Sequence, residues 1–151
     1  MALSKTERLS HYGILIIAIS ALVVSVWQVR ILQQHNKLTV KPYLDFTIVY
    51  SSEKIMKVTL SNQGFGPAIF EKLTYKYQGK EYSSWEEVLK EANQWENVKG
   101  WFNYGPNTIM APGSELTLLR LAKEDFKQIG IQLDIVYQSI YEENFIRTIE
   151  L

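Results

Sequence analysis

A run of twenty-one residues without a charged side chain, Leu9 to Val29, constrains the fold of this chain more than any other feature. At 1.5 Å per residue, a helix of this length crosses the roughly 30 Å hydrocarbon layer of a bilayer. Tyr12 and Trp27 stand near its two ends, where amphipathic rings prefer the headgroup boundary. Arg8 and Arg30 bracket it with charges that can reach outward. The sequence therefore predicts one transmembrane helix.

Two alternatives to a membrane helix are a cleaved secretory signal peptide and a buried core helix. Ala18-Ile19-Ser20 is an acceptable cleavage site, but cleavage there would leave half of the apolar run on the mature protein. A core helix of a small domain normally has a polar face, whereas this run is apolar on every side. A retained membrane anchor is therefore the preferred interpretation.

Basic residues on both flanks of the run bear on its orientation. Lys5 and Arg8 precede it, and Arg30, Lys37 and Lys41 follow it. Because basic flanks tend to stay on the cytoplasmic side, three residues against two favour a cytoplasmic C-terminal domain.

Four small or weakly polar residues of the run share one helical face, because they recur at spacings of three, four and three. They are Ala18, Ala21, Ser25 and Gln28. Such a stripe lets helices approach closely in lipid, which predicts a homo-oligomer formed through this helix. Ala and Ser are also common in membrane helices that do not associate, so both interpretations stay open.

Pro42 closes the polar juxtamembrane segment after the run, because proline cannot continue a regular helix. The expected organisation is an N-terminal tail at 1–8, a transmembrane helix at 9–29, a juxtamembrane linker at 30–42 and one domain at 43–151. About 115 residues outside the span match the usual size of one domain with one core.

Beyond residue 42 the pattern changes from helical to alternating, with β-branched and aromatic residues dominating. Ser84 and Glu87 match a capping box for a helix that reaches about Gln94, and 123–129 is compatible with a helical turn ended by Gly130. About seven strands at this spacing predict a mainly β fold, an immunoglobulin-like β-sandwich with a short helical insertion. The predicted strands include 43–50, 55–61, 68–77, 115–121, 131–137 and 145–151.

Two motifs in this region resemble those of a known group of proteins. They are HNKLTVKPYL at 35–44 and NQGFGPAI at 62–69. With them, residues 10–75 resemble uncharacterised small bacterial single-span membrane proteins that have an N-terminal helix and a C-terminal β-sandwich. In that pattern the second motif is the turn between the second and third strands. The resemblance implies a bacterial membrane protein and supplies no catalytic residue.

Few residues of the sequence suggest catalysis, metal binding or nucleotide binding. The chain has no cysteine, which excludes disulfides, thiolate nucleophiles and Cys-based metal sites. His11 and His35 are too far apart in sequence to suggest a local metal site, and no nucleophile-elbow motif supports a catalytic triad. Gly64-Phe65-Gly66 lacks the third glycine and the lysine of nucleotide-binding loops. No enzyme, cofactor or metal is therefore predicted.

The charge of the domain argues against binding to duplex nucleic acid. After residue 36 the chain has thirteen basic and fifteen acidic side chains, without the basic footprint that such binding needs. An acidic stretch around the predicted helix is interpreted as a solvated face rather than a metal site, since lysines are interleaved with the glutamates. Its members are Glu86, Glu87, Lys90, Glu91, Glu96 and Lys99.

The most suggestive cluster is aromatic, and its members fall within twenty residues. They are Trp85, Trp95, Trp101, Phe102 and Tyr104. Tryptophan and tyrosine are over-represented at recognition hot spots, so the cluster is predicted to bind a protein or small-molecule ligand. The alternative is that Trp85 and Trp95 only hold the helix against the sheet.

These patterns predict a non-enzymatic binding or interaction module held at the bacterial inner membrane. One alternative is an oligomeric effector of antiviral defence, CRISPR-accessory or cyclic-nucleotide-gated, that disrupts the membrane on ligand binding; this rests on similarity of layout. Another is an accessory subunit of a larger membrane complex, whose anchor would pack against foreign helices. The lipid bilayer is an expected partner in all three.

Overall fold

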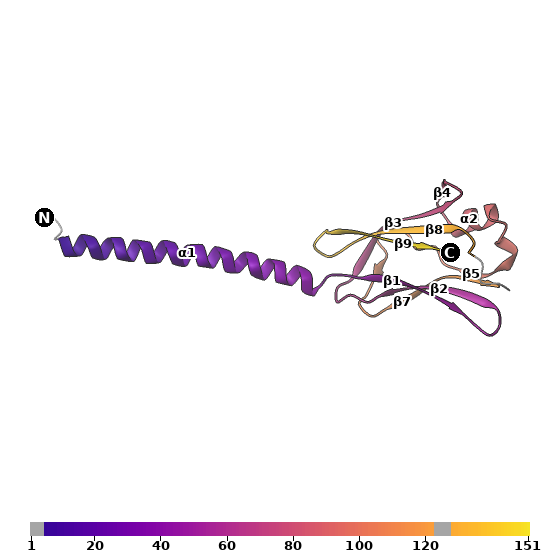
Figure 1. The fold of residues 1–151 in the computed structure, drawn as a ribbon, viewed down its shortest axis with the longest axis horizontal. Coiled ribbons are helices and arrows are strands. Elements are labelled where there is room, and N and C mark those ends of the chain that lie inside the picture. Colours follow the sequence, from indigo (N-terminus) through magenta and orange to yellow (C-terminus); the bar gives the residue numbers. More distant parts are fainter. Residues whose placement is uncertain (1–4, 123–127) are drawn as a thin grey trace. The chain divides into compact units, whose positions relative to one another are not determined.

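The computed structural model describes residues 5–122 and 128–151. The chain divides into two compact units, with the boundary between Leu38 and Thr39. The first contains one helix, α1 (Lys5–Thr39), and the second contains β-strands with two short helical segments (Figure 1).

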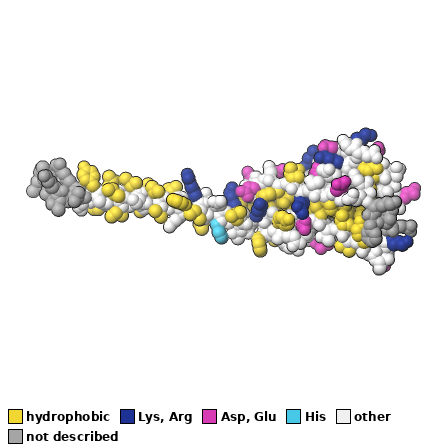
Figure 2. All heavy atoms as spheres, in the orientation of Figure 1, with side chains coloured by type: hydrophobic (Ala, Val, Ile, Leu, Met, Phe, Trp, Pro, Cys, Tyr) yellow, Lys and Arg dark blue, Asp and Glu magenta, His cyan; other side chains and the backbone are white. Residues whose placement is uncertain are grey.

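Helix α1 is long and apolar enough to cross a membrane. Residues 10–39 form the candidate span, and no residue of its most apolar window is buried. Figure 2 shows hydrophobic side chains along this helix, whereas charged side chains gather on the second unit. The helix continues ten residues beyond the predicted span, through most of the predicted linker, because no helix-breaking residue occurs before Pro42. The prediction of one N-terminal helix suited to a membrane is therefore confirmed.

The second unit is mostly β, with two antiparallel sheets that form the layers seen in Figure 1. One sheet has the strand order β1-β2-β7-β5, and the other has the order β4-β3-β8-β9, with β6 also paired to β3. The strands are β1 (Leu44–Tyr50), β2 (Ile55–Asn62), β3 (Ala68–Tyr77), β4 (Lys80–Tyr82), β5 (Val98–Trp101), β6 (Ile109–Met110), β7 (Glu115–Ala122), β8 (Ile131–Gln138) and β9 (Asn144–Glu150).

The described residues thus contain nine strands where about seven were expected. The six predicted ranges agree with β1, β2, β3, β7, β8 and β9 to within one residue at each end. The additional strands are short: β4 has three residues, β5 four and β6 two. The predicted helical turn at 123–129 lies mostly outside the described residues.

Alternation along the strands builds the core. In β2, Met56, Val58 and Leu60 are buried, as the sequence pattern predicts. Every second residue of β8 is buried, starting at Ile131. Together with Phe70 of β3, these side chains form one hydrophobic cluster that contains residues of both sheets. Burial of apolar surface at about 25 cal/mol per Å² is the main force that holds the layers together.

The predicted helix is α2 (Trp85–Glu91), which ends about three residues earlier than expected. Ser84 is its N-cap and accepts a hydrogen bond from the Glu87 amide, as predicted. The Glu87 carboxylate accepts mainly from the amide and hydroxyl of Ser83, at 2.9 and 3.0 Å, with a smaller contribution from the Ser84 backbone. These hydrogen bonds lower the pKa of Glu87. Asn93, with φ of 53°, turns the chain out of the helical direction.

Candidate functional site

The predicted aromatic cluster does not form one surface. Trp85 is fully buried at the start of α2, and its ring lies 4.7 Å from that of Tyr75 on β3. Burial raises the pKa of the Tyr75 hydroxyl. Trp85 therefore holds α2 against the sheet and is closed to a partner, which matches the structural alternative for this residue.

Trp95 and Trp101 form an aromatic pair, in which Trp95 is partly buried against the core and Trp101 is exposed. Trp95 opens the short 3₁₀ helix η1 (Trp95–Asn97), and Trp101 ends β5; their ring centroids are 4.9 Å apart in an edge-to-face arrangement. The Lys90 ammonium lies 5.2 Å from the Trp95 ring centroid, within the range of a cation–π contact. Trp101 keeps 38% of its surface exposed. The sequence analysis assigned Lys90 to a solvated face and did not group it with the aromatic residues, although Lys90 lies only five positions before Trp95.

Phe102 and Tyr104 form a second aromatic group. Their rings are stacked with centroids 6.3 Å apart, and the Tyr104 ring meets the buried Phe70 edge-on. The Tyr104 hydroxyl donates to the Thr117 carbonyl oxygen at 3.4 Å, and partial burial raises its pKa. Phe102 is 56% exposed. Tyr104 is thus anchored in the fold, whereas Phe102 is presented to solvent.

The two groups flank the end of one edge strand. β5 pairs with β7 and is the last strand of its sheet in the described part of the chain. Neighbouring residues on a strand point to opposite sides, and Trp101 and Phe102 contact different aromatic partners. We define the aromatic surface as the set Lys90, Trp95, Trp101, Phe102 and Tyr104. This arrangement can bury apolar area on either side of an added chain or ligand.

The predicted association stripe lies on one face of α1. The Ser25 hydroxyl donates to the Ala21 carbonyl oxygen of its own helix at 2.8 Å. Its hydrogen is therefore used within the helix, but its oxygen can still accept from another chain. Ala18 and Gln28 complete the stripe, and all four positions are exposed. Association through them stays a prediction.

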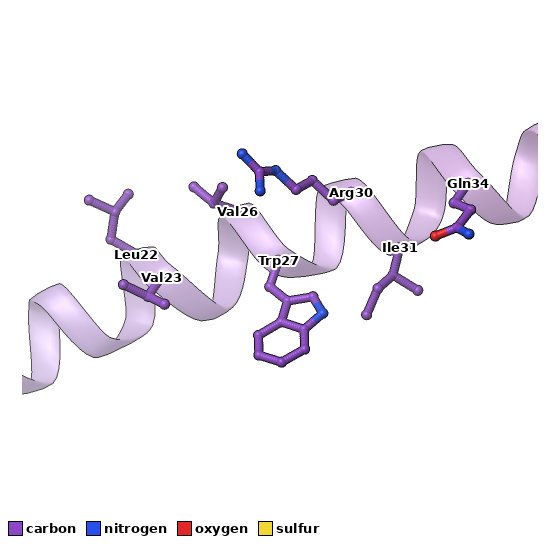
Figure 3. Close-up of a pocket in the computed structure, with 7 residues that line it drawn as sticks. All are labelled: Leu22, Val23, Val26, Trp27, Arg30, Ile31 and Gln34. Carbon is purple, nitrogen blue, oxygen red and sulfur yellow. The ribbon is translucent and has the colours of Figure 1, made fainter.

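A shallow hollow occupies the opposite face of α1 (Figure 3). With 3.6 residues per turn, the centre of this hollow lies about half a turn round the axis from the predicted stripe. Val26 and Arg30 point to one side of the helix and Trp27 and Ile31 to the other. The hollow thus lies between two rows of side chains spaced by four residues. Leu22, Val23 and Gln34 also line it.

Sequence reasoning missed the packing of the two motifs against each other. The β2–β3 loop (63–67) lies against the segment that leads into β1, which we call the junction segment (40–43). A Cβ atom at Gly66 would overlap the Val40 carbonyl, and one at Gly64 would overlap backbone atoms of Lys41 and Tyr43. These two glycines are therefore required by close backbone approach.

Asn62 connects these segments from a buried position. Its Nδ2 donates to the carbonyl oxygens of Gly66 at 2.8 Å and Met110 at 3.1 Å. Its Oδ1 accepts from the amides of Tyr43 at 3.2 Å and Gly64 at 3.0 Å. All of its side-chain hydrogen-bonding groups are thus used, as a buried amide requires.

A polar cluster joins β3, β8 and β9. Asp134 accepts hydrogen bonds from Lys76 at 2.7 Å, Gln132 at 2.8 Å and Thr148 at 2.7 Å. Burial alone would raise the pKa of Asp134, but these donors together outweigh burial and hold it below its usual value. The Lys76 pKa is raised by the same contact. The cluster is a structural ion-pair network on the sheet.

Metal-binding groupings do not occur among the described residues: no three His, Cys, Asp or Glu side chains come together. His11 and His35 lie on α1, separated by 24 residues, or about 36 Å along the helix. One ion cannot be bound by both within a chain.

Comparison with known proteins gives no family. No protein-family model matches the chain, and no curated protein matches its sequence significantly.

Proposed function

We propose that this chain is a non-enzymatic binding module tethered to the bacterial inner membrane by α1. The observation that carries the proposal is the aromatic surface beside an edge strand, with Trp101 and Phe102 exposed at adjacent positions. Large aromatic rings bury much area at modest entropy cost, which makes them frequent anchors of binding. The apolar helix would confine that binding to the membrane surface.

An extended polypeptide is the class of partner that this surface favours. An edge strand offers backbone groups to an added strand, and flanking side chains then provide specificity. Apart from its two chain neighbours, Gly100 of β5 has no atom within 4 Å of the place where a Cβ would lie. Its φ is not in the left-handed region, so the backbone conformation does not require glycine. An open glycine next to Trp101 suits a close backbone approach.

We also propose that the β domain is immunoglobulin-like. What supports this is the order of the strands. The immunoglobulin sheets have the orders ABED and C′CFG. Taking β1, β2, β7 and β5 as A, B, E and D leaves β4, β3, β8 and β9 as C′, C, F and G. In that fold, edge strands and end loops commonly carry recognition.

Photocrosslinking from the full-length chain in membranes tests the binding proposal. Replacing Phe102 by p-benzoyl-phenylalanine keeps an aromatic ring at an exposed position and should give one discrete protein adduct. Adding Trp101→Ala should lower the adduct yield at least fivefold. Tyr50→Ala is the matched control, because Tyr50 on β1 is also 38% exposed, and it should leave the yield unchanged.

Two results would overturn the proposal. One is an absent adduct, or an adduct whose yield is insensitive to Trp101→Ala. The other is catalytic turnover by the purified chain that is lost when a single polar residue is changed.

A further inference from the structure

One row of residues crosses the outer face of the sheet that contains β5. Backbone pairing places each member of the row directly opposite the next: Val49 of β1, Lys57 of β2, Arg120 of β7 and Gly100 of β5. Arg120 faces outward, because the residues before and after it on β7 are fully buried and successive side chains of a strand alternate. The row therefore ends at Gly100 on the edge strand that carries the aromatic surface.

Two cations stand directly opposite each other in this row. Like charges at opposed positions of neighbouring strands repel, so the pair Lys57 and Arg120 destabilises the sheet unless anions balance it. The Lys57 ammonium lies 3.4 Å from the Glu115 carboxylate, which balances one of the two charges. Within residues 5–122 and 128–151, no carboxylate forms an ion pair with Arg120. This part of the domain therefore leaves the charge of Arg120 unbalanced.

Gly100 leaves the space between Arg120 and the edge of the sheet open. Apart from its two chain neighbours, no atom lies within 4 Å of the place where its Cβ would be. Neighbouring strands are about 4.8 Å apart, so a strand added beside β5 would place one of its residues about 10 Å from Arg120, with only Gly100 between them. An arginine and a glutamate side chain are together long enough to meet across that distance.

Other charges near the edge strand support an acidic partner. Lys99 precedes Gly100 and is exposed on β5 itself. Glu96 is the acidic residue nearest to Gly100 in the sequence, and it lies in η1, where it lines a hollow together with Lys90. Positive charge on an edge strand discourages indiscriminate pairing with other chains. A carboxylate on the added strand replaces that repulsion with attraction, which makes the edge selective.

We propose that the edge of β5 binds an extended segment of a partner protein that carries an acidic side chain opposite Gly100, where its carboxylate pairs with Arg120. This rests on the proposed function of the aromatic surface, and it adds the charge of the segment that is bound. Phe102 lies two positions after Gly100 and is exposed, so alternation gives it the same side. The preferred segment therefore has an acidic residue and, two positions away, an apolar one.

Crosslinking to two synthetic peptides tests this inference. The full-length chain in mild detergent, with p-benzoyl-phenylalanine in place of Phe102, is irradiated with a biotinylated heptapeptide of alternating threonine and valine whose central valine is replaced by glutamate. The second peptide has glutamine at that place. The glutamate peptide should give at least threefold more adduct than the glutamine peptide, because opposite charges on neighbouring strands attract. Raising the salt concentration should reduce this ratio, since exposed ion pairs are screened.

Variants of the chain show whether Arg120 causes the preference. Arg120→Gln should give equal yields with the two peptides, whereas Arg120→Lys should keep the preference for glutamate. Lys72→Gln is the matched control, since it removes the same charge from an exposed position on the other sheet, and it should also keep the preference.

Three results would contradict the inference, and they are distinct. Equal yields with both peptides in the parent chain, or a preference that survives Arg120→Gln, would overturn the inference and leave the binding of extended polypeptides intact. A preference that is lost equally in Lys72→Gln would overturn it as an effect of net charge. No adduct with either peptide would overturn the proposed binding of an extended polypeptide and the inference together.

Discussion

Replacing Asn62 by alanine tests how strongly the two sequence motifs depend on each other. The change removes four side-chain hydrogen bonds, with Tyr43, Gly64, Gly66 and Met110, from a site that is almost fully buried. At about 1 kcal/mol net for each bond, the free energy of unfolding should fall by roughly 4 kcal/mol. A domain of this size has only about 5–15 kcal/mol in total, so the loss is large.

Thermal unfolding of the full chain in mild detergent, followed by near-ultraviolet circular dichroism, measures this effect. At about 4 °C per kcal/mol for a domain of this length, Asn62→Ala should lower the Tm by roughly 15 °C. Asn97→Ala is the matched control, since Asn97 is exposed and its side-chain amide donates to Gln94; its Tm should stay within about 2 °C. A drop of less than about 4 °C for Asn62→Ala would refute the reasoning.

Three further predictions concern other parts of the chain. Gly66→Ala should destabilise the domain by several kcal/mol in urea unfolding because its Cβ meets backbone, whereas Gly100→Ala should change stability by about 0.5 kcal/mol or less; equal effects would count against the close packing. Because the pKa of Asp134 is lowered in the fold, its contribution to stability is present above the unfolded pKa and lost as pH falls through the folded value. As the pH is lowered below about 4, the urea midpoint of Asp134→Asn should therefore fall less steeply than that of the parent chain. Parallel curves of urea midpoint against pH would contradict this prediction. Oxidation of Ser25→Cys chains in membranes should give homodimers in higher yield than Val23→Cys on the opposite face; equal yields would contradict the predicted stripe, and heteromeric products would favour an accessory subunit.

Local sequence patterns predicted the helices and the longer strands of the fold well. The uncharged run predicted a helix suited to a membrane, since twenty-one helical residues are long enough to cross the hydrocarbon layer. The turn-forming residues on either side of β3 gave its observed bounds, 68–77, and Ser84 gave the start of α2. In each case the signal lies within the segment itself, because one buried face or one cap determines the local structure.

Elements that depend on distant partners were not predictable in the same way. β5 forms by pairing with β7, and β6 by pairing with β3. With four and two residues, these strands are too short to show an alternation of hydrophobic and polar residues in the sequence. The continuation of α1 past residue 29 is a different case, because its reason is local: the polar residues there are compatible with a helix and no breaker intervenes. Glu87 bonds mainly to Ser83, an additional partner that the capping-box spacing does not encode.

The candidate site was predicted only as a region. Five aromatic residues close in sequence could not reveal that Trp85 enters the core while Phe102 faces solvent, because burial is decided by the packing of α2 on β3. Likewise, the turn at 63–67 was recognisable from its composition, but its contact with the junction segment requires the folded domain. Composition locates such residues, and tertiary packing divides them into structural and exposed groups.

Retention of α1 in the lipid bilayer is the central claim, and alkaline carbonate extraction of membranes that contain the full chain tests it most directly. At high pH, peripheral proteins are released, whereas a helix with its apolar surface in hydrocarbon stays with the lipid. The intact chain is expected in the membrane pellet. Recovery of the intact chain in the supernatant would contradict the account.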